Sequence, residues 1–273
     1  YIFYHEAVIE RPRPEVMRHM LAGENLGLVT RRQQLPDKEC TYFFVTDKII
    51  SDGVIRSDNR GSESLFPLYL YPSAESPNAF HQERRPNLAE WLLPKLSDAY
   101  GFTLTPEDVL AYIYAVFYSP TYRQKYAEEL RIDFPRVPFT ADSALFRRMA
   151  DLGRQLTDLH LLRKVGNTAG VRYQGQGSDI IEKVQYVAAK ARVYINADKY
   201  FEGITEPMWQ YRIGGYQVLE KYLKDRKGRR LDDPVRYIHI ASAIARTIEL
   251  QKEIDKLYRA VEQNTLPNLL HEA

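Results

Sequence analysis

Apolar residues recur every three or four positions in several parts of the chain, which is the spacing of one helix face. The clearest case is "TPEDVLAYIYAVF", where Thr105 can cap a helix and Pro106 and two acidic residues occupy the first turn. Its apolar residues are predicted to share one face: Val109, Ile113, Val116 and Phe117. Shorter helices are predicted for "PRPEVMRHML" and "SPTYRQKYAEEL", which also carry an early proline.

Two longer helices are predicted from longer stripes of the same spacing. One follows Thr140 and uses Leu145, Met149, Leu152, Leu156 and Leu159. The other ends the chain and uses Val235, Ile238, Ala241, Ile244, Ile248, Ile254, Leu257 and Val261.

Strands are predicted where β-branched and aromatic residues gather between turn-forming residues. Near the N-terminus these are "LGLVTRRQ", "TYFFVTDKII" and "SLFPLYLYP", with a turn at "SDGVIRSDNRG". Further along, "GVRYQ", "EKVQYVA", "ARVYINADKYF" and "PMWQYRI" predict a small antiparallel sheet with glycine-bearing turns.

These elements together predict an α+β fold with a mixed N-terminal sheet, a central helical block, a small antiparallel sheet and long C-terminal helices. Residues 72–86 are rich in Ser, Pro, Asn, Glu and Arg and are interpreted as a linker or surface loop. The predicted division is therefore residues 1–72 and residues 73–273. Within the second part, helices are expected over 87–164, the sheet over 165–212 and helices over 215–264.

Composition narrows the class of protein. With 273 residues, 44% of them hydrophobic, the chain can bury a sizeable core. A net charge of only +2 means that any anion binding must come from local clusters of basic residues. The single cysteine, Cys40, excludes a disulfide framework and favours a reducing, cytoplasmic location. No apolar run is long enough to span a bilayer, so no membrane association is expected.

Two further features concern the start of the chain and its tyrosines. The chain begins at Tyr1 without an initiator methionine, and we expect it to be a piece of a longer polypeptide. Its 20 tyrosines suit a recognition surface, but core packing is the preferred interpretation for most of them. Tyr118, Tyr122 and Tyr126 repeat every four residues, which predicts one packed helix face.

Motifs for catalysis are absent from the sequence. There is no phosphate-binding G-x-x-x-x-G-K-[ST] loop, no H-E-x-x-H motif and no G-x-S-x-G elbow. The six histidines are scattered without metal-ligand spacing, and His160 and His239 lie in helical patterns where a structural role is expected. We expect this chain to contain no catalytic residues and no metal ligands.

Two clusters carry side chains that suit the reading of nucleic-acid bases. Arginine can fork onto guanine, and glutamine or asparagine can pair with adenine. The clusters are "TRRQ", after a predicted strand, and "IRSDNRG", on a predicted loop. The candidate base-reading residues are Arg31, Arg32, Gln33, Arg56, Asn59 and Arg60. An ordinary charged strand end and a polar turn are the alternatives.

A third cluster is strongly basic. Gly214 and Gly215 precede "YQVLEKYL", and backbone N–H groups at a helix start favour phosphate. The basic residues that follow can neutralise phosphates and release counterions: Lys224, Arg226, Lys227, Arg229 and Arg230. A solvated basic loop is the alternative.

Several strings, in the same order along the chain, resemble the C-terminal target-recognition region of type ISP restriction–modification polypeptides, with kinship to type IIG enzymes. They are "IERPRPEVMRHM", "NLGLVTRRQ", "VTDKIISDGVI", "FPLYLYP", "YSPTYRQKYAEELRIDFPRVPF" and "WQYRIGGYQVLEKYLKDRKGRRL". The resemblance covers most of the chain and rests on no single string.

The resemblance implies a sequence-specific reader of double-stranded DNA in a bacterial defence enzyme. It implies that a nuclease, a helicase-like ATPase and an N6-adenine methyltransferase lie upstream, with residues 1–72 adjoining the methyltransferase core. S-adenosylmethionine, ATP and Mg²⁺ are then expected for those domains, and no cofactor for this chain. The methyltransferase would act as an enzyme on a flipped adenine, while this chain fixes its register on the DNA.

Two other hypotheses compete with this one. The chain could be a scaffold between domains of the same kind of polypeptide, with its long C-terminal helix packed on its neighbours. It could also be an enzyme in its own right, which a pocket holding acids of strongly shifted pKa would support.

Overall fold

The computed structural model describes residues 13–33, 40–50, 63–72, 83–163 and 165–267. The chain forms two compact units. Unit 1 comprises Tyr1–Thr157 and Ile254–Ala273, and unit 2 comprises Asp158–Glu253. The predicted α+β class is confirmed. These units divide the chain at different places from the predicted boundary after residue 72, so that boundary remains a prediction about the parent polypeptide.

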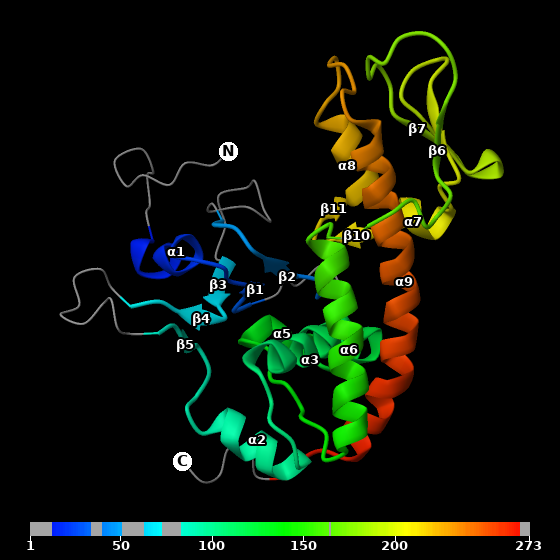
Figure 1. Cartoon of the computed structure of the whole chain (residues 1–273). Coiled ribbons are helices and arrows are strands. Elements are labelled where there is room, and N and C mark those ends of the chain that lie inside the picture. Colours follow the sequence, from blue (N-terminus) through cyan, green and yellow to red (C-terminus); the bar gives the residue numbers. More distant parts are fainter. Residues whose placement is uncertain (1–12, 34–39, 51–62, 73–82, 164, 268–273) are drawn as a thin grey trace. The chain divides into compact units, whose positions relative to one another are not determined.

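A three-stranded antiparallel sheet begins unit 1 (Figure 1). Its central strand is β1 (Gly27–Arg31), which pairs with β2 (Phe43–Thr46) on one side and β3 (Glu63–Pro67) on the other. Helix α1 (Pro14–Leu21) contributes two methionines to the core beside the sheet, which contains Met17, Met20, Val29, Tyr42 and Leu65. The helix and strands predicted for this region are confirmed.

The predicted strand "SLFPLYLYP" is divided in two. After β3 the chain passes Leu68 and continues as β4 (Tyr69–Leu70), which pairs with β5 (Arg85–Pro86). The side-chain oxygen of Asn25 accepts hydrogen bonds from the backbone N–H groups of Leu26 and Tyr69, which holds the break in place. The end of the predicted linker is therefore a strand; residues 73–82 lie outside the described residues.

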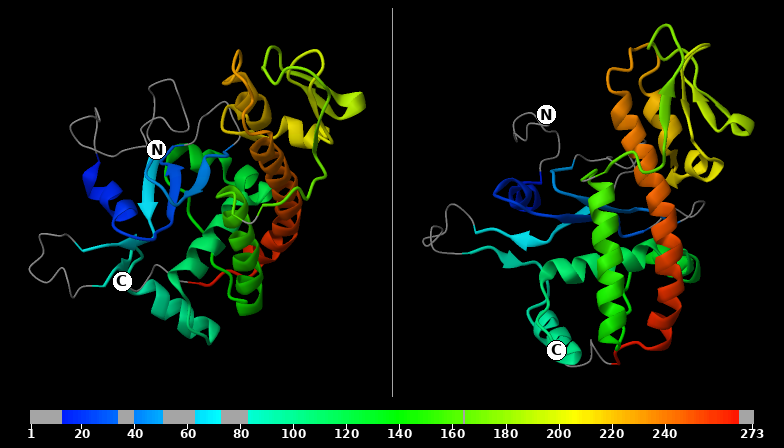
Figure 2. Two further views of the ribbon diagram at one scale, coloured as in Figure 1. Left: turned by 45° about the horizontal axis from the view of Figure 1, so that its top comes forward. Right: turned by 45° about the vertical axis from the view of Figure 1, so that its right-hand side comes forward.

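Helices make up most of the rest of unit 1 (Figure 2). They are α2 (Leu92–Tyr100), α3 (Pro106–Tyr118), α4 (Pro120–Lys125), α5 (Ala127–Ile132) and the larger part of α6 (Ser143–His160). Thr105 caps α3 as predicted, and with Asp108 it forms a capping box of reciprocal side-chain to backbone hydrogen bonds.

The single apolar face predicted for α3 is too narrow. Its tyrosines and alanines are buried as well, so nine of its 13 residues are inside, while Ile113 of the predicted face is only partly buried. Tyr112 and Tyr118 reach backbone carbonyls with their hydroxyl groups, which is how a tyrosine can be buried without leaving a polar atom unpaired.

The three tyrosines spaced by four residues belong to different elements. Tyr118 ends α3, Tyr122 lies in α4 and Tyr126 separates α4 from α5. A new helix begins because Ser119 caps α4 through the backbone N–H of Tyr122. The one-helix face is therefore wrong, but core packing is confirmed for Tyr118 and Tyr122, which are buried.

A four-stranded antiparallel sheet forms one side of unit 2. Its strand order is β6-β9-β8-β7, with bounds Arg172–Gln174 (β6), Gln185–Val187 (β7), Arg192–Tyr194 (β8) and Tyr200–Glu202 (β9). A 3-10 turn over Ala188–Lys190 joins β7 to β8. The small antiparallel sheet is confirmed for "GVRYQ", "EKVQYVA" and "ARVYINADKYF". The strand predicted at "PMWQYRI" is wrong for its first part, since Glu206–Gln210 form a helix, and Arg212–Ile213 pair in a separate two-stranded sheet.

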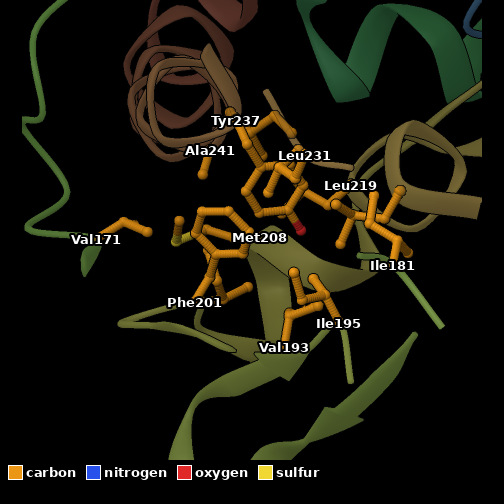
Figure 3. Close-up of a cluster of buried hydrophobic side chains, with 13 residues drawn as sticks. Val171, Ile181, Val193, Ile195, Phe201, Met208, Leu219, Leu231, Tyr237 and Ala241 are labelled. Atoms are coloured by element: carbon orange, nitrogen blue, oxygen red, sulfur yellow. The ribbon is translucent and has the colours of Figure 1, made fainter. Parts of the chain in front are cut away.

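The core of unit 2 lies between this sheet and three helices: α7 (Glu206–Gln210), α8 (Val218–Lys224) and the first two thirds of α9 (Pro234–Gln263). Figure 3 shows Phe201 and Val193 of the sheet facing Tyr237 and Ala241 of α9. Of the apolar stripe predicted for α9, Val235 is exposed, because it lies in the first turn of the helix.

The two glycines before α8 have a different role from the one predicted. Gly214 and Gly215 form the turn between β10 (Arg212–Ile213) and β11 (Tyr216–Gln217), and Gly214 has a φ of 57°. Two-residue hairpin turns of this kind require positive φ, which glycine adopts without steric cost. They are therefore not the phosphate-binding start of a helix, since α8 begins only at Val218.

None of the helices that the structure describes combines the length and the apolar character of a membrane-spanning helix.

Replacing Gly153 by alanine should destabilise unit 1. A Cβ at Gly153 of α6 would lie 1.8 Å from the carbonyl oxygen of Ala111 in α3, so the two helices would have to separate. Alanine normally stabilises a helix interior by about 1 kcal/mol relative to glycine, whereas overpacking costs roughly 1–3 kcal/mol. We expect a lower free energy of unfolding in a denaturant titration.

Gly166→Ala is the control, because no atom lies within 4 Å of the added Cβ. A Gly153→Ala protein as stable as the control would show that α3 and α6 are not in this close contact.

Candidate functional site

The segment Lys224–Arg230, called here the basic loop, connects α8 to α9 in unit 2. It is fixed to the segment 179–181 by backbone hydrogen bonds. The N–H of Gly228 donates to the carbonyl of Ile181 at 2.7 Å, and the N–H of Ile181 donates to the carbonyl of Arg229 at 3.0 Å. The N–H of Leu231 donates to the carbonyl of Asp179 at 2.9 Å. The predicted loop is therefore anchored to the sheet side of the unit.

One carboxylate reinforces this anchor. Asp179 accepts a hydrogen bond from the hydroxyl of Tyr173 at 2.9 Å, and it forms ion pairs with Lys199 at 3.3 Å and Arg230 at 3.6 Å. The Tyr173 hydrogen bond and then the two cations hold the pKa of Asp179 below its ordinary value. Asp179 thus joins the sheet, the turn before β9 and the end of the basic loop.

Three of the five basic side chains already interact with neighbouring residues through ion pairs, a hydrogen bond or a ring contact. Lys224 pairs with Glu220 at 3.0 Å. Arg226 donates to the carbonyl of Tyr222 and lies 3.8 Å from the centre of its ring. Arg230 is the residue paired with Asp179, although 73% of its side chain is exposed.

Lys227 and Arg229 differ from these three. Both are exposed, and within the described parts of the chain neither side chain forms an ion pair or a hydrogen bond. The neighbouring Asp225 is held by Lys221 at 2.8 Å instead. The basic loop therefore presents two uncompensated positive charges on a fixed backbone.

The predicted base readers differ in exposure to solvent: Arg31 is buried, whereas Arg32 and Gln33 are exposed. Arg31 is buried, with 7% of its side chain exposed, and lies 3.6 Å from the carboxylate of the buried Glu63. Its guanidinium also lies over the ring of Tyr42. In this structure Arg31 stabilises the sheet and is not on the surface, because both faces of β1 are covered at this end of the strand, where Thr30 is buried as well.

Arg32 and Gln33 are exposed just beyond the end of β1. The Nε of Arg32 donates to Asp133 at 2.9 Å, and the amide of Gln33 donates to the carbonyl of Ile132 at 3.2 Å. The structure therefore places both side chains beside the segment 132–134. The other three predicted readers, Arg56, Asn59 and Arg60, lie outside the described residues.

An apolar surface next to Arg32 and Gln33 was not predicted. Phe66 and Phe134 pack edge to face with ring centres 5.5 Å apart, and they are 40% and 38% exposed. Ile132 is 68% exposed. In the sequence, only the string "RIDFP" indicates an exposed apolar surface, because it places two large apolar residues beside an aspartate and a proline.

Among the described residues, the carboxyl groups whose pKa values shift are all shifted downward. No three His, Cys, Asp or Glu side chains among them gather to hold a metal ion. Hydrogen bonds from Thr105 and the ion pair with Arg154 lower the pKa of Asp108, and the Tyr173 hydrogen bond and two cations lower that of Asp179. Both carboxylates therefore stay charged near neutral pH and are not poised as proton donors. His160 contacts Thr247 at 3.0 Å, as expected for a structural histidine.

Three solved structures share this fold. The ATP-dependent Type ISP restriction-modification enzyme LlaBIII bound to DNA matches 93% of this chain with 21% identity and a TM-score of 0.69. The DrdV–DNA complex matches 90% with 23% identity and a TM-score of 0.62. A nuclease-deletion mutant of the Type ISP enzyme LlaGI, in complex with a DNA substrate mimic, matches 85% with 20% identity and a TM-score of 0.58.

The matched regions are 17%, 25% and 21% of those chains, so this chain spans a quarter or less of each. A comparison with curated proteins found no match. The family model described as the Type ISP C-terminal specificity domain matches residues 1–254. The chain belongs to this family, and the resemblance seen in the sequence is confirmed.

Replacing Asp179 by asparagine should loosen the anchor of the basic loop in a pH-dependent way. The pKa of Asp179 is lower in the folded than in the unfolded chain. Its contribution to stability is therefore fully present at pH values above the unfolded-state pKa of about 3.9, and it is lost as the pH falls through the folded-state pKa. Amide hydrogen exchange at Ile181 and Leu231, compared at equal pH, should be roughly two- to tenfold faster in Asp179→Asn at pH 7.

The difference in exchange rate between Asp179→Asn and the original protein should narrow as the pH falls below about 4. Asp198→Asn is the control, since Asp198 is exposed on the neighbouring turn and forms no ion pair within the described residues. Equal exchange in Asp179→Asn and the original protein at pH 7 would contradict the anchoring role.

Proposed function

We propose that this chain recognises double-stranded DNA as the specificity domain of a restriction–modification polypeptide. Its family and the DNA complexes among structures of the same fold support this function. The observation that carries the proposal is the pair of uncompensated cations, Lys227 and Arg229, held on an anchored loop.

The anchor matters because phosphate contacts set the register of a protein on DNA. A loop that is already fixed loses little conformational entropy when it binds, so little of the attraction between its charges and the phosphates is offset by the cost of ordering the loop. Lys227 and Arg229 are therefore the proposed principal phosphate contacts. Lys224, Arg226 and Arg230 contribute to the local positive potential but must first leave, or share, their present partners.

Base reading is proposed for Arg32 and Gln33 in unit 1, whose polar groups are exposed and suit guanine and adenine edges. Asp133 holds the Arg32 guanidinium before DNA binds. The buried Arg31 supports β1 and so positions the two residues that follow it. Arg56, Asn59 and Arg60 remain proposed readers on sequence grounds alone.

The whole polypeptide is proposed to methylate adenine at N6 and to cleave DNA through upstream domains. Those domains would use S-adenosylmethionine, ATP and Mg²⁺, and this chain would hold the DNA while the adenine is flipped from the stack. No cofactor is proposed for this chain. A reducing, cytoplasmic location is part of the proposal, and the buried free thiol of Cys40 is compatible with it.

A second function is favoured by the apolar surface of Phe66, Ile132 and Phe134. Exposed apolar groups of this size suit contact with another protein surface, as in an interdomain scaffold. The two functions differ in their electrostatics, since an apolar contact is nearly independent of salt while phosphate binding weakens steeply with it.

Replacing Lys227 and Arg229 together by alanine should weaken binding to every duplex, whatever its sequence. The slope of log K against log salt is about −0.9 per phosphate contact, so losing two contacts should reduce its magnitude by about 2. Fluorescence anisotropy with a labelled duplex at several salt concentrations measures both quantities.

The matched control is Lys190→Ala with Lys252→Ala, which removes two exposed cations of unit 2 outside the basic loop. An unchanged slope in the Lys227 and Arg229 variant would rule out the phosphate role of the loop.

Arg32→Ala should relax the preference at one base pair by roughly 1–3 kcal/mol, because a forked contact to a base edge is lost. Asp133→Ala is its comparison variant, because it removes the ion-pair partner but keeps the Arg32 side chain that would contact the base. Competition between duplexes that differ at single positions measures the preference. If Arg32→Ala keeps every preference of the original chain, Arg32 is not a base reader.

A further inference from the structure

We propose that Gln176, an exposed residue of the segment 175–180, reads a base edge beside the phosphates bound by the basic loop. This inference rests on the proposed function and adds a specificity-determining residue in unit 2. The segment, called here the reading loop, connects β6 to the stretch that leads to β7. Figure 1 and both views of Figure 2 show it next to the connection between α8 and α9.

The reading loop is fixed on two sides. On one side, the antiparallel bridge between Ile180 and Arg230 and the flanking backbone hydrogen bonds join it to the basic loop. On the other side, the buried Asn196 donates its amide to the carbonyls of Ser178 at 2.7 Å and Ile180 at 3.0 Å. The side-chain oxygen of Asn196 accepts from the N–H groups of Asp198 and Lys199.

Two glycines set the backbone conformation on either side of Gln176. Gly175 and Gly177 have φ values of 98° and 102°, in the region that favours glycine. A Cβ at Gly175 would lie 2.0 Å from the carbonyl oxygen of Asp198, so the loop is packed against the turn before β9. The residue between them, Gln176, is exposed, and its amide has no hydrogen-bond partner within the described residues.

The remaining side chains suit a base edge better than a phosphate. Gln176 is neutral, with a donor and an acceptor on one planar group, which is the pattern that pairs with adenine. Ile180 is 44% exposed although its backbone is held on both sides, and an exposed aliphatic group can contact a thymine methyl. Ser178 is taken up locally, since its hydroxyl accepts from the N–H of Ile180.

Proximity to the cations gives the loop its role. Paired strands lie about 4.8 Å apart, so Ile180 is one strand spacing from Arg230, and Arg229 is the next residue. The major groove is about 12 Å wide between its phosphate walls. The bridge therefore places the reading loop beside the cations, the arrangement required for one loop to bind the phosphates at a groove edge and its neighbour to contact the bases.

The test is selection of bound sequences from a randomised duplex pool by the full chain and its variants. Gln176→Ala should lose preference at one position, by roughly ten- to hundredfold, with little change in binding to random duplexes or in the salt slope. Gln176→Glu should move the preferred base at that position toward cytosine, because a carboxylate only accepts hydrogen bonds and cytosine offers a donor.

Gln210→Ala is the matched control, since Gln210 is an exposed glutamine of unit 2 on α7. If the original chain selects a sequence and Gln176→Ala selects the same one with equal strength, the inference is overturned while the proposed function stands. If the original chain binds no duplex at low salt, the proposed function itself fails. A change of preferred base in Gln176→Glu excludes a purely structural role for Gln176.

Discussion

The backbone pairing of residues 179–181 with residues 228–231 is the interaction on which the binding surface of unit 2 depends. Without it, the basic loop would be a solvated connection between two helices, and the reading loop would be held on its other side, by Asn196, but not on this one. Asp179 strengthens this pairing by joining Tyr173, Lys199 and Arg230, and it does so at neutral pH because its carboxylate stays ionised. One short pairing thus holds the loop that carries Lys227 and Arg229 beside the loop that carries Gln176.

The local environment decides which arginines and lysines are available to DNA. Arg31 and Arg32 are adjacent, yet one is sealed in the sheet with Glu63 and the other is exposed beside Asp133. The basic loop shows the same division on the surface, where Lys224 and Arg230 have carboxylate partners and Lys227 and Arg229 have none among the described residues. A count of basic residues in a sequence therefore overstates the number of cations that are ready to meet phosphate.

Much of the fold could be predicted, because the signals are local. The Thr105 cap, the early prolines of the helices and most of the aromatic strand segments each act over a few residues, and the structure confirms them. The division of "SLFPLYLYP" depends on Asn25, 44 residues away from Tyr69, and so has no local signal. The role of Gly214 and Gly215 was missed because β10 and β11 are only two residues long, which leaves almost no pattern of alternation.

The candidate site was harder to predict because it depends on contacts between residues far apart in the sequence. The sequence pointed to the basic loop but not to its anchor, since Asp179 and Arg230 meet only through the fold. It also pointed to Arg31, because alternation along β1 does not reveal that the strand end is covered. Gln176 carried no signal beyond its two flanking glycines, and it gains its meaning only from the loop that lies next to it.

The most direct measurement is site-specific cross-linking from the basic loop to DNA. The only native thiol, Cys40, is buried, so a Lys227→Cys protein can be labelled selectively with a photoactivated cross-linker. We expect cross-links to duplex DNA from this position, decreasing as salt rises, and none from the exposed position 252 in a Lys252→Cys protein. Equal cross-linking from both positions, or none from position 227, would contradict the account.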